Sequence, residues 1–277
     1  MNETPRDEAR PLVISLTSIP PRFPYLGETL SSLLEQRAEV ESVNLYLPRQ
    51  YRRFDWDSAN LPRVPEGVNI RLVDEDLGPA TKVLPAAREY QGRPVSILFC
   101  DDDKVYDRDW ARRFVDCSLQ HPGCCIVEEG GDVAHYSSHD VRGNLQPRAR
   151  RRRKDLAYRL RRLASLGLWK PRKTASSGYV DVLEGWGGVL VKPEFFRASA
   201  YQIPDILWLV DDIWLSGQLA LHHIPIWLNA EGDARAKGNS NEVSQASLRK
   251  LVYQGHGRVE ANQACIDYFR REHGIWR

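Results

Sequence analysis

Three consecutive carboxylates, Asp101, Asp102 and Asp103, follow directly on the apolar run of residues 95–100. A short β-rich apolar run predicts a buried strand, so the carboxylates stand at a strand end and repel one another unless a cation or hydrogen bonds compensate. Mg²⁺ and Mn²⁺ favour oxygen ligands, and Mg²⁺ is commonly held by one or two carboxylates together with substrate phosphates. The plainer interpretation is an acidic turn that caps the next helix.

Two further motifs offer groups that bind anions. Residues 16–22 run from a strand into a hydroxyl-rich turn with two prolines, where a base and a ribose could lie while Arg22 reaches a phosphate. Residues 76–82 contain a Gly-Pro bend, after which Lys82 would stand at a helix N-terminus, a place that favours anions. The alternatives are a plain strand-to-helix turn and a solvated surface lysine.

Two motifs in the second half suggest an acceptor loop and a base. In residues 184–188, glycines flank Trp186, which lets backbone approach a ligand and frees the indole to stack on a sugar face. A buried core tryptophan is the alternative. Asp211 and Asp212 open an apolar helix; capping explains one of them, and the other could point into a cleft as a general base.

The elements that must position these residues alternate between strand and helix. Apolar patterns predict strands at 12–17, 43–47, 68–73, 95–100 and 125–127, and helices at about 25–36, 82–90 and 108–120. Further strands are expected at 178–183, 187–191 and 224–228, with a helix from 211 to about 221. This order predicts an α/β fold with a mostly parallel sheet and helices on both faces, in which ligands bind at the carboxyl ends of the strands.

Composition limits the classes of protein that the chain can belong to. No stretch approaches the roughly 18 apolar residues of a membrane span, and residues 1–10 form a polar tail without a secretory signal. The five cysteines are odd in number and lack CxxC spacing, which argues against a disulfide framework and a structural zinc site. We expect a cytoplasmic protein with one catalytic domain over residues 11–277.

The net charge of +2 hides a basic segment at residues 148–173, which holds twelve Lys or Arg and one acid. It lies in a polar stretch, residues 137–177, that we interpret as a mobile insertion. Leu156, Leu160 and Leu163 would share one face of a basic amphipathic helix. Residues 148–169 could therefore contact an anionic membrane surface such as the inner face of the membrane. A solvated loop is the alternative, and nucleic-acid binding is disfavoured because no RNA-recognition motif is visible.

Taken together, the chain resembles glycosyltransferases of the GT-A fold, in particular bacterial family-2-like and capsular or lipopolysaccharide-type enzymes of polysaccharide biosynthesis. The motifs are SLTSIPPR, DLGPATK, the DxD motif within FCDDDK, EGWGG and DDIWLSG, in the family's order over about residues 12–230. The resemblance implies a Rossmann-like nucleotide-sugar fold, a nucleotide-sugar donor (usually a UDP-sugar) and Mn²⁺ or Mg²⁺.

The resemblance also implies roles for individual residues. Asp103 would bind the metal with Asp101 in support, and His256 is the candidate for a further ligand. Asp212 would be the general base beside Asp211, although the family's pair commonly reads Glu-Asp. The expected donor site comprises Thr17, Ser18, Ile19, Arg22, Lys82, Asp101 and Asp102, and the expected acceptor site comprises Glu184, Gly185, Trp186 and Gly187.

The expected reaction is transfer of a sugar to a glycan or lipid-linked acceptor with inversion, although the sequence leaves retention open. One alternative is a Mg²⁺-dependent phosphohydrolase of the haloacid dehalogenase type, with Asp101 as nucleophile and Asp211 and Asp212 as its later acidic motif. Another is a non-catalytic adaptor that binds membrane or nucleic acid through residues 148–173.

Overall fold

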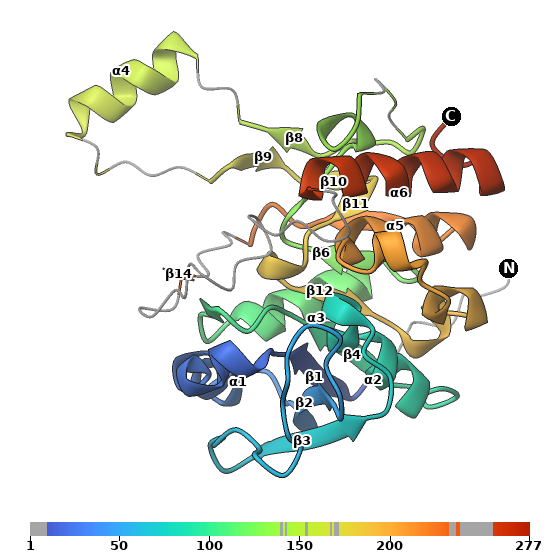
Figure 1. The fold of residues 1–277 in the computed structure, drawn as a ribbon. Helices are drawn as coiled ribbons and strands as arrows, with labels where there is room; N and C mark the ends of the chain where they lie inside the picture. The colour runs from blue at the N-terminus through green and yellow to red at the C-terminus, as the bar shows by residue number, and fades with distance from the viewer. Residues whose placement is uncertain are drawn as a thin grey trace, which may run out of the picture.

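A sheet of eight strands forms the centre of the computed structural model, which describes residues 10–138, 141, 143–152, 155–166, 168, 172–232, 237–238 and 257–277 (Figure 1). The strand order is β10-β13-β6-β12-β4-β1-β2-β3. Strands β4, β1, β2 and β3 are parallel, whereas β12 runs antiparallel between β4 and β6, and β10 runs antiparallel to β13. The strands are β1 (Leu12–Thr17), β2 (Ser42–Pro48), β3 (Val68–Val73), β4 (Ser96–Phe99), β6 (Cys125–Val127), β10 (Gly178–Val180), β12 (Val189–Val191) and β13 (Ile226–Leu228).

Helices cover both faces of this sheet, as the sequence predicted. Because successive side chains of a strand point to opposite faces, a strand buried on both sides is apolar throughout. In β1, Ile14 and Leu16 pack in one core cluster with side chains of α1 and α3, and Val13 packs in the other with α2, α5 and α6. The helices are α1 (Gly27–Leu34), α2 (Leu84–Glu89), α3 (Trp110–Gln120), α5 (Asp211–Leu221) and α6 (Arg258–His273).

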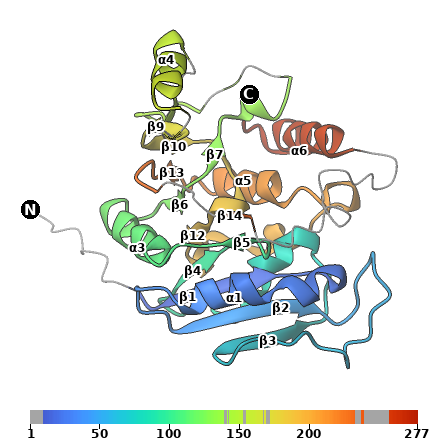
Figure 2. The same ribbon diagram turned by 90° about the vertical axis from the view of Figure 1, so that its left-hand side faces the viewer.

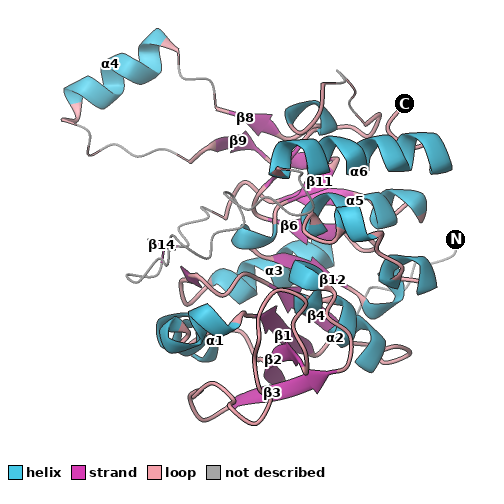
Figure 3. Cartoon of the chain, in the orientation of Figure 1, coloured by secondary structure: helices cyan, strands magenta, loops and turns pink. Residues whose placement is uncertain are grey.

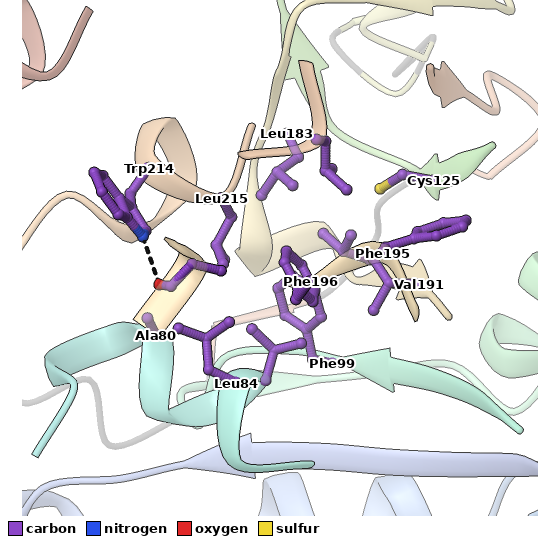
Figure 4. Close-up of a cluster of buried hydrophobic side chains, with 14 of the residues drawn as sticks. Ala80, Leu84, Phe99, Cys125, Leu183, Val191, Phe195, Phe196, Trp214 and Leu215 are labelled. Atoms are coloured by element: carbon purple, nitrogen blue, oxygen red, sulfur yellow. Dashed lines mark hydrogen bonds between the residues drawn. The ribbon is translucent and has the colours of Figure 1, made fainter. Parts of the chain in front are cut away.

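The larger of the two clusters fixes α5 against the sheet. In Figure 4, Trp214 and Leu215 of α5 belong to the same buried cluster as Leu84 of α2 and Phe99 of β4. The buried indole of Trp214 donates from Nε1 to the carbonyl of Ala200 at 2.9 Å, so its polar atom is satisfied inside the core. The first turn of α5, which carries the paired aspartates, is therefore held rigidly over the sheet.

Prolines and glycines shift several predicted boundaries. The helix expected at about 82–90 begins at Leu84 as α2, and a 3-10 turn, Gly78–Lys82, precedes it. Pro85 lies in the first turn of α2, where a missing N–H costs little. The strand expected from residue 187 begins at Val189, because a 3-10 turn, Gly185–Gly187, precedes it and Gly188 has φ +97°. The helix predicted at about 25–36 is α1, Gly27–Leu34, and a 3-10 turn, Pro20–Tyr25, precedes it.

The described part of the basic segment forms an arm on the body of the protein. Strands β8 (Arg150–Arg151) and β9 (Thr174–Ser176) pair antiparallel, and helix α4 (Leu156–Ala164) lies at the far end of the arm (Figures 1 and 3). Figure 2 shows α4 and β3 at opposite ends of the molecule. Two short pairs complete the architecture: β7 (Gly130–Gly131) with β11 (Val182–Leu183), and β5 (Lys104–Val105) with β14 (Lys237–Gly238).

Two predictions from composition can be compared with the structure. All five cysteines are buried and free in the structure. Among the described residues, every helix is too short or too polar to span a bilayer.

Candidate active site

The three carboxylates that follow β4 lie in three different surroundings. The Oδ1 atom of Asp101 accepts a hydrogen bond from Lys82 Nζ at 2.7 Å. Asp102 is buried, and its two oxygens accept from Ser18 Oγ and from Arg22 Nη1. Oδ2 of Asp103 lies 3.6 Å from Arg22 Nη2, and its buried Oδ1 lies 3.4 Å from Lys104 Nζ. Oδ1 accepts no hydrogen bond from the described residues. Asp103 is thus the member of the triplet with acceptor capacity to spare.

Lys82 is the electrostatic centre of the site. Its side chain is buried, and Nζ lies 2.7 Å from Asp101 Oδ1 and 2.8 Å from Asp211 Oδ2. Burial alone would lower the pKa of Lys82, but the facing carboxylates outweigh burial and raise it well above its ordinary value. For Asp101, burial would raise the pKa, and Lys82 reverses this and lowers it. The alternative of a solvated surface lysine is wrong: Lys82 is a buried ammonium between two carboxylates.

Asp212 lies beside this ion-pair network, and its pKa is shifted in the opposite direction from that of Asp101. Burial, followed by the charge of Asp211, raises the pKa of Asp212 to about 8, and Lys82 opposes this only in part. Its Oδ1 accepts from the backbone N–H of Gly185 at 3.0 Å, and Arg258 Nη2 lies 3.9 Å from Oδ2. An oriented carboxyl group that titrates near neutral pH has the properties of a general acid or base.

The loop of residues 184–188 closes over Lys82 and Asp212. A Cβ atom on Gly185 would lie 2.5 Å from Lys82 Nζ and 3.2 Å from Asp212 Oδ1, so this position requires glycine. Trp186 is half-buried, with its Nε1 donating to Glu184 Oε2 at 2.7 Å and Lys173 Nζ 4.7 Å from its ring. The interpretation of Trp186 as a buried core residue is therefore wrong, and its indole borders the site.

Tyr106 links this loop to the acidic triplet. Its hydroxyl donates to the carbonyl of Trp186 at 3.2 Å and to that of Asp101 at 3.3 Å. Trp110 of α3 supports the same loop by donating from Nε1 to the carbonyl of Gly187 at 3.0 Å. Buried aromatic side chains with satisfied polar atoms hold the two motifs at a fixed separation.

The turn after β1 contacts the triplet from the other side. Ser18 and Arg22 reach Asp102, whereas Thr17 donates to the carbonyl of Tyr46 on β2 at 2.8 Å. Ile19 precedes the 3-10 turn Pro20–Tyr25 and is half-buried. The structure thus brings Ser18 and Arg22 to the carboxylates, while the side chain of Thr17 binds the neighbouring strand.

Sequence reasoning missed a second carboxylate at a strand end. Glu129 follows β6 as the triplet follows β4, and this parallel could have identified it. Burial is the largest cause that raises the pKa of Glu129 to about 7, with Lys173 opposing and Glu184 adding to the rise. Lys173 Nζ lies 3.8 Å from Glu129 Oε1. Tyr136 was also missed, and its hydroxyl donates to Glu184 Oε1 at 2.5 Å.

Tyr51 and Trp56 add an aromatic wall behind the turn at Ser18. The hydroxyl of Tyr51 donates to the carbonyl of Ser18 at 2.8 Å, and its ring meets Trp56 edge-on at a centroid distance of 5.4 Å. Neither residue belongs to a motif, so no sequence pattern points to them.

The fit of a metal ion rests mainly on Asp103. Within the described residues, no group of three His, Cys, Asp or Glu side chains could hold a metal ion by itself. In this part of the chain, Oδ1 of Asp103 accepts no hydrogen bond and has only Lys104 Nζ at 3.4 Å, so it could bind an ion such as Mg²⁺, which takes one or two carboxylates and completes its shell with water and phosphate oxygens. Asp101 is engaged by Lys82, and His256 lies outside the described residues.

Comparison with known proteins gives limited guidance. No family model matches the chain, and no curated protein matches its sequence. Among solved structures, TarS of S. aureus (residues 1–349) is similar over 80% of this chain, with 12% identity and a TM-score of 0.43. A longer TarS structure gives 11% identity and the same TM-score. The chain spans 58% and 35% of these two chains. A likeness this distant carries no argument about function, which rests on the geometry of the site.

Proposed function

We propose that this chain is a glycosyltransferase that moves a sugar from a nucleotide-sugar donor, with UDP-sugars the first class to test, to a hydroxyl of a glycan or lipid-linked acceptor. The observation that carries the proposal is Asp212. It is a half-buried carboxyl group with a pKa of about 8, oriented by Gly185 N–H between an ion-pair network and a loop that presents an indole. This arrangement suits deprotonation of a hydroxyl nucleophile.

The donor would lie against the cations that surround the triplet. Arg22, Lys82 and Lys104 lie among the carboxylates of this strand end, so a diphosphate would bind there together with a divalent cation that offsets the acidic charge. Asp103 would hold Mn²⁺ or Mg²⁺ together with the donor phosphates, with Asp101 nearby. When bound, the ion would neutralise negative charge on the diphosphate. Ser18 and Arg22 fix Asp102, which makes Asp102 a positioning residue for this loop.

The acceptor would bind at the loop of residues 184–188, where Trp186 offers an apolar ring to a sugar face and Glu184 offers hydrogen-bond acceptors. Asp212 takes the proton from the attacking hydroxyl as that oxygen bonds to the anomeric carbon. The bond from this carbon to the phosphate oxygen breaks, and the nucleoside diphosphate leaves with the electron pair. Attack from the face opposite the leaving group inverts the configuration.

Lys82 argues against the phosphohydrolase alternative. That mechanism needs Mg²⁺ beside the nucleophile Asp101 and the acidic pair at Asp211. The ammonium of Lys82 already stands between these carboxylates, at 2.7 and 2.8 Å. The alternative also leaves Arg22, Trp186 and the raised pKa of Asp212 without a role.

Thermal-shift screening with nucleotides and nucleotide sugars, with and without Mn²⁺, tests the proposal. A ligand that binds the folded state stabilises it by about 2.7 kcal/mol at a hundredfold excess over Kd. We expect one nucleotide class to stabilise the protein with Mn²⁺ present, and Asp103→Ala to abolish this shift. Asp116→Ala, which removes an exposed carboxylate of α3, is the matched control and should retain it.

A measurement of turnover distinguishes a glycosyltransferase from a non-catalytic adaptor. With the donor class known, Asp212→Asn should keep the donor-induced shift and lose sugar transfer and donor hydrolysis. Stabilisation by phosphate mimics with Mg²⁺, and by no nucleotide, would support the phosphohydrolase instead. Binding of donor with equal turnover in the wild type and Asp212→Asn would contradict the role of Asp212.

A further inference from the structure

Helix α4 presents an apolar face to solvent. Leu156, Leu160 and Leu163 stand at the spacing that places side chains on one side of a helix, and they are 72%, 57% and 73% exposed. We call these three residues the leucine face. No described residue covers it, and Leu166 and Leu168, which follow α4, are exposed as well. Adjacent exposed leucines mark an interaction surface, since single apolar residues scattered over a surface are the ordinary case.

The charge around the leucine face indicates what binds it. Arg159, Arg161 and Arg162 lie on the rest of the helix surface and are exposed. The one acid of the segment, Asp155, caps the helix by accepting from the backbone N–H of Tyr158 at 2.8 Å. The segment 148–173 is therefore strongly basic around an apolar stripe, a combination that suits a bilayer surface with anionic headgroups.

Other occupants match this surface less well. A nucleic acid would pair with the arginines and leave the leucine face in water. A second copy of α4 could cover the leucines, but it would bring two strongly basic segments together. An anionic membrane satisfies both features, because acyl chains receive the leucines and phosphates receive the arginines.

We infer that α4 docks on an anionic lipid membrane, with the leucine face in the headgroup–acyl boundary and its arginines at the phosphates. The arm connects this surface to the candidate active site. Lys173 at its base lies 4.7 Å from the Trp186 ring, and Arg151 Nη2 lies 3.8 Å from Glu184 Oε1. Docking would thus bring the acceptor loop close to the lipid surface. A lipid-linked acceptor follows from this placement and rests on the proposed function, whereas docking itself does not.

Vesicle flotation tests the docking without reference to catalysis. The full chain is mixed with vesicles of phosphatidylcholine, or of phosphatidylcholine with phosphatidylglycerol, and we expect it to float with the second kind. The double variant Leu156→Ser/Leu163→Ser should bind about a hundredfold more weakly, because each of the two buried leucines contributes roughly a factor of ten. The matched control, Leu61→Ser/Leu119→Ser, changes two exposed leucines of the body and should bind as the wild type does.

Each other outcome overturns the inference. Binding to neither kind of vesicle, or equal binding by both double variants, would show that the leucine face does not insert. Self-association that is lost in Leu156→Ser/Leu163→Ser, without vesicle binding, would make the face an interface between copies. Binding to RNA or DNA but not to vesicles would assign the arginines to nucleic acid. If flotation fails but nucleotides still raise the thermal stability, the docking inference is wrong and the proposed function is unaffected.

Discussion

At the scale of single residues, Lys82 compensates two carboxylates at once. Replacing it by methionine would leave Asp101 and Asp211 facing each other without a cation. Removing one partner of a buried ion pair leaves an uncompensated charge, so we expect Lys82→Met to lower the free energy of unfolding by about 3 kcal/mol, measured by urea denaturation. The double variant Lys82→Met/Asp211→Asn should regain part of that loss. Two equally destabilised variants would mean that packing, and not charge, explains the effect.

The protonation of Asp212 makes stability depend on pH. Its pKa is raised from the ordinary 3.8 to about 8, so between these values the folded state holds a proton that the unfolded state has released. The resulting stabilisation is complete below the unfolded pKa and is lost as pH rises through about 8. Relative to Asp212→Asn, the wild type should therefore lose stability with rising pH, by at most about 1.4 kcal/mol per pH unit.

Unfolding titrations of both proteins from about pH 5 to 9 measure this difference. Asp211→Asn tests the cause, because removal of the neighbouring charge should move the inflection to lower pH while burial keeps it above the ordinary value. Identical pH profiles for the wild type and Asp212→Asn would show that Asp212 does not titrate in this range.

At the scale of elements, the 3-10 turn Gly185–Gly187 brings backbone against the ion-pair network. A methyl group on Gly185 would meet Lys82 Nζ at 2.5 Å, so we expect Gly185→Ala to cost about 1–3 kcal/mol of stability and to reduce turnover more strongly than donor binding. Gly27→Ala is the matched control, because a Cβ there has no atom within 4 Å and alanine favours the helix α1. Wild-type turnover in Gly185→Ala would disprove this role of the loop.

The elements differ in how far the sequence could predict them. Helix α5 (Asp211–Leu221) and strands β1 and β6 have the predicted bounds, because their apolar patterns are continuous and contain no proline. The segment before α2 was predicted as a Gly-Pro bend with Lys82 opening the helix, whereas it forms a 3-10 turn, Gly78–Lys82. Tertiary contacts decide this turn: Trp208 donates to the carbonyl of Asp76 at 2.9 Å, and its backbone oxygen lies 2.5 Å from the Cβ position of Gly78.

At the scale of the whole molecule, the α/β class and the mostly parallel sheet could be predicted from alternating patterns, but the placement of β12 could not. Nothing in the sequence indicates that β12 runs antiparallel between β4 and β6. For the same reason, the motifs identified candidate residues but could not predict which of them contact one another. Lys82 meets Asp101 and Asp211 because the sheet brings three segments together, and such distant pairings leave no local signal.

The arm and the body should be separable. Among the described residues, none between 150 and 176 belongs to either buried core cluster. The arm also begins and ends at adjacent points, since the N–H of Arg152 donates to the carbonyl of Lys173 at 2.7 Å. Replacing residues 153–172 by a short glycine linker should therefore leave Tm within about 3 °C of the wild type, the shift that roughly 1 kcal/mol causes in a domain of this size.

The same deletion should retain the nucleotide-dependent thermal shift, because the residues around Lys82 and Asp103 remain. It should abolish flotation with phosphatidylglycerol vesicles, because the leucine face and most of the basic charge are removed. Calorimetry and flotation on one protein preparation measure both. A fall in Tm well beyond this range would show that the arm stabilises the eight-stranded sheet, and undiminished flotation would place the membrane contact on the body.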